Sequence, residues 1–141
     1  MPTGRENEAT IGARIARVEI KGAGNARWVR EAATQLTSDL IARFARSDRF
    51  APAQGSLREG LEVTVEVREV EMESGGRRPY GAARIVAEAE KISGGRVAEM
   101  SEKVKCDLDK DREMERQFAD ALAAAATPFF TKFVRECDKR Y

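Results

Sequence analysis

Residues 61–74, LEVTVEVREVEMES, alternate apolar with polar side chains, and this alternation constrains the fold most strongly. Successive side chains of a strand point to opposite sides of a sheet, so the pattern predicts a strand with one dry face and one wet face. The apolar side chains of its first half are Leu61, Val63, Val65 and Val67. The phase then shifts to Val70 and Met72, which predicts a bulge or a sharp twist near Arg68 and Glu69 that keeps the same face inward.

A hairpin is predicted downstream, in residues 85–106, IVAEAEKISGGRVAEMSEKVKC. Gly94 and Gly95 suit the positive φ angles of a two-residue type I′ turn. This turn sets the pairs Ile92 with Val97, Ala89 with Met100, Ile85 with Val104 and Glu90 with Glu99. Together with the preceding strand, we expect a three-stranded antiparallel meander over residues 61–106.

Two other segments repeat apolar side chains at helical spacing. The first follows Asn25, which we expect to be its N-cap, and carries Trp28, Val29, Ala32, Ala33, Leu36, Leu40 and Phe44. The second opens near Asp109 or Asp111 and places Pro128 on its polar side. Its apolar sector holds Phe118, Leu122, Ala126, Phe129, Phe130, Phe133, Val134 and Cys137.

A first strand is predicted ahead of these elements, around Val18 and Ile20, which gives the order β-α-β-β-β-α. A sheet with one polar face buries the other under helices. The sequence therefore predicts an α+β fold, a two-layer α/β sandwich in which both helices cover one face of a four-stranded mixed sheet. We expect a flexible tail over residues 1–10 and a single domain over residues 11–141.

The composition offers little for catalysis. The chain has no histidine, so it lacks the commonest general base and the usual metal ligand. Its two cysteines, Cys106 and Cys137, are expected to be free thiols, because a helix of roughly 39 Å would separate them. We expect no catalytic residue, no cofactor and no metal site.

The charges leave several surfaces open as contacts. A net charge of +1 creates no general attraction to nucleic acid, and the glutamates of the meander are expected to form a solvated face or a binding surface. Arg77 and Arg78 are exposed loop charges or partner contacts. Phe130 and Val134 lie toward the edge of the apolar sector, so they are core residues or the first candidates for a subunit interface.

The layout resembles that of the TolB N-terminal-like domains of bacterial envelope lipoproteins. The likeness covers residues 12–137 and rests on LIARFARSDRF at 40–50, LREGLEVTVEVREVE at 57–71, AEKISGGRVAEMSE at 89–102 and the Ala-rich last helix. Domains of this shape include activator lipoproteins of penicillin-binding proteins, the curli secretion lipoprotein and the Pel polysaccharide lipoprotein. A group of uncharacterised lipoprotein domains is most similar.

Two features depart from that pattern. The lipid-accepting cysteine is absent, so a lipid anchor would have to precede Met1, and the usual D-x-x-T-G before the turn is Glu90-Lys91-Ile92-Ser93-Gly94. The resemblance implies a non-enzymatic periplasmic accessory protein at the outer membrane that binds other envelope proteins or itself. The alternative is a cytoplasmic adaptor or nucleic-acid-binding α/β module with basic contacts at Arg27, Arg30, Arg77 and Arg78.

Overall fold

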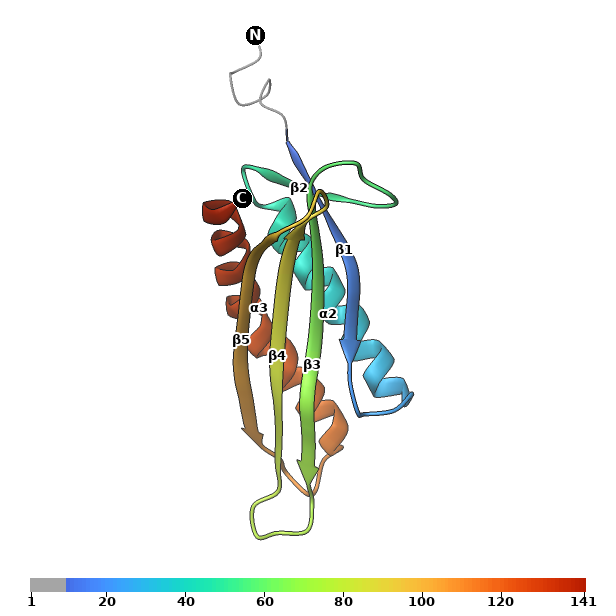
Figure 1. The fold of residues 1–141 in the computed structure, drawn as a ribbon. Helices are drawn as coiled ribbons and strands as arrows, with labels where there is room; N and C mark the ends of the chain where they lie inside the picture. Colours follow the sequence, from blue (N-terminus) through green and yellow to red (C-terminus); the bar gives the residue numbers. More distant parts are fainter. Residues whose placement is uncertain (1–9) are drawn as a thin grey trace.

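The computed structural model describes residues 10–141 and has the expected α+β architecture. Its elements are β1 (Ile11–Ile20), α2 (Arg27–Ala45), β2 (Phe50–Ala53), β3 (Leu61–Glu73), β4 (Tyr80–Lys91), β5 (Arg96–Asp107) and α3 (Met114–Arg140). The tail predicted for residues 1–10 lies, apart from Thr10, outside the described residues. In Figure 1 both helices lie behind the sheet, so its front face is uncovered.

The sheet has five strands in the order β2-β1-β3-β4-β5, so the predicted four-stranded sheet is wrong by one strand. The extra strand, β2, pairs in parallel with the start of β1, where Ile11 lies opposite Phe50. Pro52 is compatible with this position because β2 is an edge strand. β1 also runs parallel to β3, whereas β3, β4 and β5 form the predicted antiparallel meander.

The predicted bulge in β3 is confirmed. The pairing of β3 with β4 shifts between Arg68 and Glu71, and Glu69 between them has a φ of 56°. Beyond the bulge, Val70 and Met72 pack against the core on the same side as the earlier valines. One extra residue therefore keeps a strand of 13 residues amphipathic along its whole length.

The hairpin between β4 and β5 exists, but its predicted turn and register are wrong. The connection is a four-residue loop, Ile92 to Gly95, closed by a hydrogen bond of 2.8 Å from the Gly94 N–H to the Lys91 carbonyl oxygen. Ile92 cannot extend the strand pair because its N–H donates to the Gly60 carbonyl oxygen at 3.0 Å. An attachment to a loop distant in sequence thus overrides the local preference for a glycine-glycine turn.

The register of the hairpin consequently differs by two residues from the predicted one. Met100 lies opposite Ala87 and Val104 opposite Ala83, so the same side chains still face the core. Glu99 lies opposite Glu88, and the pair predicted between Glu90 and Glu99 does not form. A shift of two conserves the alternation of faces, so the burial pattern alone could not distinguish the two registers.

The helices begin later than predicted. α2 follows Ala26, not Asn25, and α3 follows Glu113; neither cap residue makes a side-chain capping hydrogen bond. The side-chain amide of Gln117 bonds the backbone of Asp109 instead, at 2.8 Å to its nitrogen and 2.9 Å to its oxygen. The acidic segment before α3 is therefore a loop fastened to the first turns of the helix.

The predicted apolar sector of α3 is confirmed at every position. Its buried residues are Phe118, Leu122, Ala126, Phe129, Phe130, Phe133, Val134 and Cys137. Pro128 lies inside the helix on the exposed side. These side chains join those of α2 and of the inner sheet face in one hydrophobic core, where Trp28 and Phe118 meet edge to face with centroids 6.0 Å apart.

The two helices lie next to each other and run in the same direction, with both N-termini at the lower end of Figure 1. The dipoles of parallel helices point the same way, so acidic side chains are favourable at the lower end of both helices and basic side chains at the upper end. Glu115 lies in the first turn of α3, and Lys139 and Arg140 lie in its last turn; Arg43 lies in the last turn of α2. The helix layer therefore has basic residues at its upper end.

Candidate interaction surfaces

The uncovered face of the sheet is organised around Glu66 on β3. This carboxylate is 8% exposed, although it projects from the face that no helix covers. Arg68 donates a 2.8 Å hydrogen bond to its Oε1, and Lys21 Nζ lies 3.0 Å from its Oε2. Arg17 approaches Oε2 at 3.4 Å. Side chains rather than protein interior therefore shield Glu66.

The hydrogen bonds to Glu66 determine its protonation. Those from Arg68 and then Lys21 hold the pKa of this carboxyl below its usual range, against the opposing effect of burial. Glu66 therefore stays ionised at neutral pH and cannot act as a general acid there. The sequence pattern of β3 does not single out this glutamate, because Arg17 reaches it from β1 and Lys21 from the turn that follows β1.

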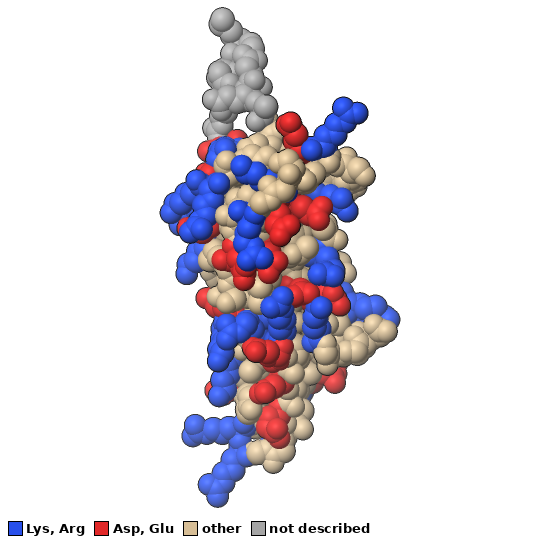
Figure 2. All heavy atoms as spheres, viewed as in Figure 1, with Lys and Arg blue, Asp and Glu red and all other residues tan. Residues whose placement is uncertain are grey.

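The rest of the uncovered face is a mosaic of ion pairs. Arg84 Nε lies 3.1 Å from Glu69, Arg14 pairs with Glu62 at 3.7 Å, and Arg96 pairs with Glu99. Figure 2 shows both signs of charge interspersed over this face. Paired, solvent-exposed charges of this kind contribute little to stability and create no strong net field. The face fits the predicted solvated surface and remains available as a weak contact surface.

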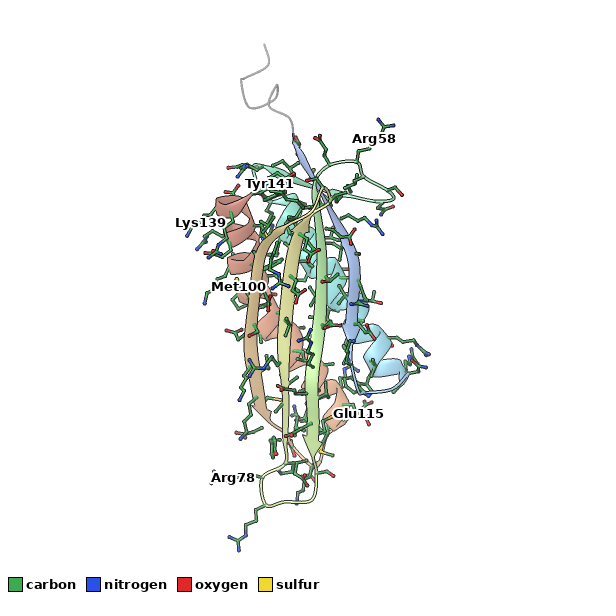
Figure 3. The ribbon with its side chains drawn as sticks, viewed as in Figure 1. Arg58, Arg78, Met100, Glu115, Lys139 and Tyr141 are labelled. Atoms are coloured by element: carbon green, nitrogen blue, oxygen red, sulfur yellow. The ribbon has the colours of Figure 1, made fainter. Side chains whose placement is uncertain are left out.

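The connection between β3 and β4 carries the predicted contact residues Arg77 and Arg78. Both are exposed, and neither makes an ion pair or hydrogen bond with any described residue. In Figure 3 the side chain of Arg78 projects away from the molecule, at the end opposite Tyr141 and Lys139. We call residues 74–79 the arginine tip.

The other two predicted interface residues, Phe130 and Val134, lie in the core of this chain. Phe130 is 0% exposed and Val134 is 7% exposed. Phe130 packs beside Phe129 with ring centroids 5.8 Å apart. Both side chains join the hydrophobic core, and Val134 also lines a groove with residues of α2. The side chain of Phe130 is therefore inaccessible to a partner protein, and that of Val134 is almost inaccessible.

Two grooves run between the helices, one at each end of the layer. The N-terminal groove has a volume of about 660 Å³ and includes Trp28, Glu31, Glu113, Glu115 and Asp120 in its lining. The C-terminal groove has a volume of about 510 Å³ and is lined by Arg43, Arg46, Ser47, Asp48, Thr131, Val134, Arg135 and Asp138. Acidic residues outnumber basic ones in the first groove and basic residues outnumber acidic ones in the second.

The two thiols are free and have raised pKa values. Cys106 and Cys137 are both free, as predicted, and Cys137 is fully buried. Burial raises the pKa of Cys137 to about 12 and also raises that of Cys106. Neither thiol is a thiolate at neutral pH. Within residues 10–141, no group of three or more cysteine, aspartate or glutamate side chains is placed to hold a metal ion.

Comparisons with known proteins identify the fold. No family model and no curated protein matches the chain. A DUF330 protein from Xanthomonas campestris superposes with a TM-score of 0.63 at 14% identity, covering 92% of this chain and 86% of that one. A hypothetical protein from Chlamydia trachomatis gives 0.59 at 10% identity, covering 94% and 98%. A lipoprotein candidate from Caulobacter crescentus CB15 gives 0.52 at 15% identity, covering 86% and 89%.

These matches show that the chain shares its fold, over 86% to 94% of its length, with DUF330-like and lipoprotein-candidate structures. At such low sequence identities, the matches are evidence for the fold and not for a function. The predicted resemblance to lipoprotein domains is confirmed at that level, and the TolB-like assignment stays a prediction. None of the helices in the described part of the chain is long and apolar enough to cross a membrane.

Proposed function

We propose that this chain is a non-enzymatic accessory or assembly module of the bacterial cell envelope. In this proposal it lies in the periplasm, held at the outer membrane by a lipid anchor on a preceding segment, and it acts through contacts with envelope proteins or with copies of itself. The observation that carries the proposal is the match to the Caulobacter lipoprotein candidate over 86% of this chain and 89% of that one.

The arginine tip lies at the end of the molecule opposite the N-terminus, and this placement supports contacts there. The described chain begins at Thr10, and the N–H of Ile11 donates to the Arg49 carbonyl oxygen at 2.8 Å, near the C-terminal ends of both helices. The arginine tip lies at the opposite end of the sheet (Figure 3). A module tethered through its N-terminus would therefore present Arg77 and Arg78 away from the membrane. Because their guanidinium groups have no partner among the described residues, they are free to bind carboxylates of another protein.

Fractionation of the native host tests the compartment. The full-length protein should be recovered with the envelope and should be released from it by detergent. The complete reading frame should encode a hydrophobic segment that ends in a cysteine. Recovery of all the protein in the cytosol would contradict the proposal and would favour the cytoplasmic adaptor.

Chemical cross-linking of the envelope fraction tests the contact. We expect a cross-linked species that is lost in the variant with Arg77→Gln and Arg78→Gln. Arg58→Gln is the matched control, because Arg58 is an exposed arginine at the opposite end without a partner among the described residues. Light scattering of the purified chain at rising concentration then separates the two kinds of partner. Growth to a defined oligomer indicates self-assembly, and a persistent monomer indicates a different protein.

A further inference from the structure

The C-terminal groove gathers three arginines whose hydrogen-bonding groups are unused. Arg43 and Arg46 come from the end of α2 and Arg135 from α3, 89 residues later than Arg46. None of the three guanidinium groups donates a hydrogen bond to a described residue, although each has five N–H donors. The Nε of Arg43 is the one buried side-chain nitrogen or oxygen among the described residues that lacks such a partner. Buried donors without a partner are rare, so the Nε of Arg43 is available to donate to a ligand oxygen.

The charges of the groove are only partly balanced. Arg43 Nε lies 3.5 Å from Asp39 Oδ1 on the same helix, and Asp39 also accepts a 2.9 Å hydrogen bond from the Thr127 hydroxyl of α3. Asp138, on the groove wall, is paired with Arg49 at 3.4 Å. Asp48 is the remaining carboxylate of the lining. Arg46 and Arg135 form no ion pair with a described residue, so the groove carries a surplus of positive charge.

Compensation of the helix dipoles accounts for Arg43 and Arg46 at the end of α2, but not for Arg135 on α3. Charge at a helix end interacts with the dipole mainly within the last turn. The last turn of α3 already contains Lys139 and Arg140. Arg135 lies more than a turn before the end of α3 and faces the groove, where it meets Arg43 and Arg46 from the other helix.

We propose that the C-terminal groove binds a phosphate group, held by Arg43, Arg46 and Arg135. Guanidinium groups match phosphate oxygens in bidentate geometry, and three of them around one groove suit a group that offers several oxygens. Ser47 adds a further donor: its oxygen accepts the N–H groups of Arg49 and Phe50 at 3.2 Å each, which leaves its own proton to donate. A volume of about 510 Å³ admits a phosphorylated small molecule or a lipid headgroup.

Titration of the purified chain with inorganic phosphate at constant ionic strength tests this site, with NMR chemical shifts as the readout. We expect saturable shifts confined to the ends of α2 and α3. Arg46→Gln and Arg135→Gln should each weaken binding by about tenfold or more, since each removes charge-assisted hydrogen bonds. Both side chains are exposed, so the variants should fold.

Arg116→Gln is the matched control, because Arg116 is an arginine of the N-terminal groove and has no partner among the described residues. Its phosphate affinity should be unchanged. Vesicles of phosphatidylglycerol and of phosphatidylcholine then distinguish a lipid headgroup from a soluble phosphate. Binding to phosphatidylglycerol alone that is weakened by Arg46→Gln and Arg135→Gln indicates a lipid headgroup, and saturation by free phosphate indicates a soluble ligand. No saturable binding to any probe, or equal weakening by all three substitutions, would overturn the proposal. The outcome does not depend on the cellular compartment.

Discussion

Gly81→Ala should destabilise the fold through a single contact between β4 and α3. A Cβ added at Gly81 would lie 2.4 Å from Cδ1 of Phe118, 3.0 Å from Cε1 and 3.1 Å from Cγ. Favourable carbon–carbon contacts lie near ~3.5–4.0 Å, so the ring or the strand must move. Phe118 is 0% exposed and also packs edge to face against Trp28, which leaves the ring little room.

The cost follows from two opposing effects. Adding one carbon to a closely packed site costs about 1–3 kcal/mol, whereas replacing glycine stabilises by about 0.4–1 kcal/mol because the unfolded chain loses freedom. We therefore expect the free energy of unfolding to fall by about 1–2 kcal/mol. Phe118→Leu should relieve part of the clash, so the double variant should be more stable than the sum of the single effects by about 0.5 kcal/mol or more.

Urea denaturation followed by far-UV circular dichroism measures these free energies. The fluorescence of Trp28, the one tryptophan, reports on the neighbourhood of Phe118 in the same experiment. Gly76→Ala is the control, because the nearest atom to its added Cβ is 3.9 Å away, in the exposed arginine tip. An unfolding free energy for Gly81→Ala equal to that of the wild type, or strict additivity with Phe118→Leu, would refute the packing argument.

Three further predictions concern single groups. Gly60→Ala should destabilise more than Gly81→Ala, because Gly60 has a φ of 126° and its Cβ would lie 2.4 Å from the Gly12 carbonyl oxygen; thermal unfolding measures both. Glu66→Gln should lower the free energy of unfolding at neutral pH, and the gap between variant and wild type should shrink as the pH falls. A carboxyl whose pKa is lowered by folding stabilises the native state above its unfolded pKa and loses that effect when it is protonated. Denaturation across pH 3–7 tests this, and a gap that does not change with pH would contradict it. Cys137, whose pKa is about 12, should react with a thiol reagent at mildly alkaline pH only on unfolding, and prompt reaction in the native protein would show that it is accessible.

Local periodicity predicted most of the elements because it records burial directly. The alternation in β3, the compensating bulge and the full buried sector of α3 all depend on which side chains face one core. The short strand β2 was missed because four residues containing a proline have no readable period, and only their parallel pairing with β1 makes them a strand. The hairpin register was missed because it depends on the bond from Ile92 to Gly60, in a loop about thirty residues earlier.

The candidate surfaces were less predictable than the fold. Arg77 and Arg78 were identifiable because a glycine-rich turn between strands is exposed wherever it occurs. The C-terminal groove had no sequence signal, since Arg46 and Arg135 meet only because the two helices run in the same direction. Phe130 and Val134, at the edge of the apolar sector, are buried in the hydrophobic core, which the sequence pattern of α3 alone did not decide.

Site-specific photo-cross-linking in the native host tests the proposed function most directly. A photoreactive amino acid replaces Arg78 at the arginine tip, and the same replacement at Arg58 serves as the control at the opposite end. The proposal predicts a discrete cross-linked product from position 78 in the envelope fraction and none from position 58. A protein confined to the cytosol, or an envelope protein whose position 78 never cross-links, would contradict it.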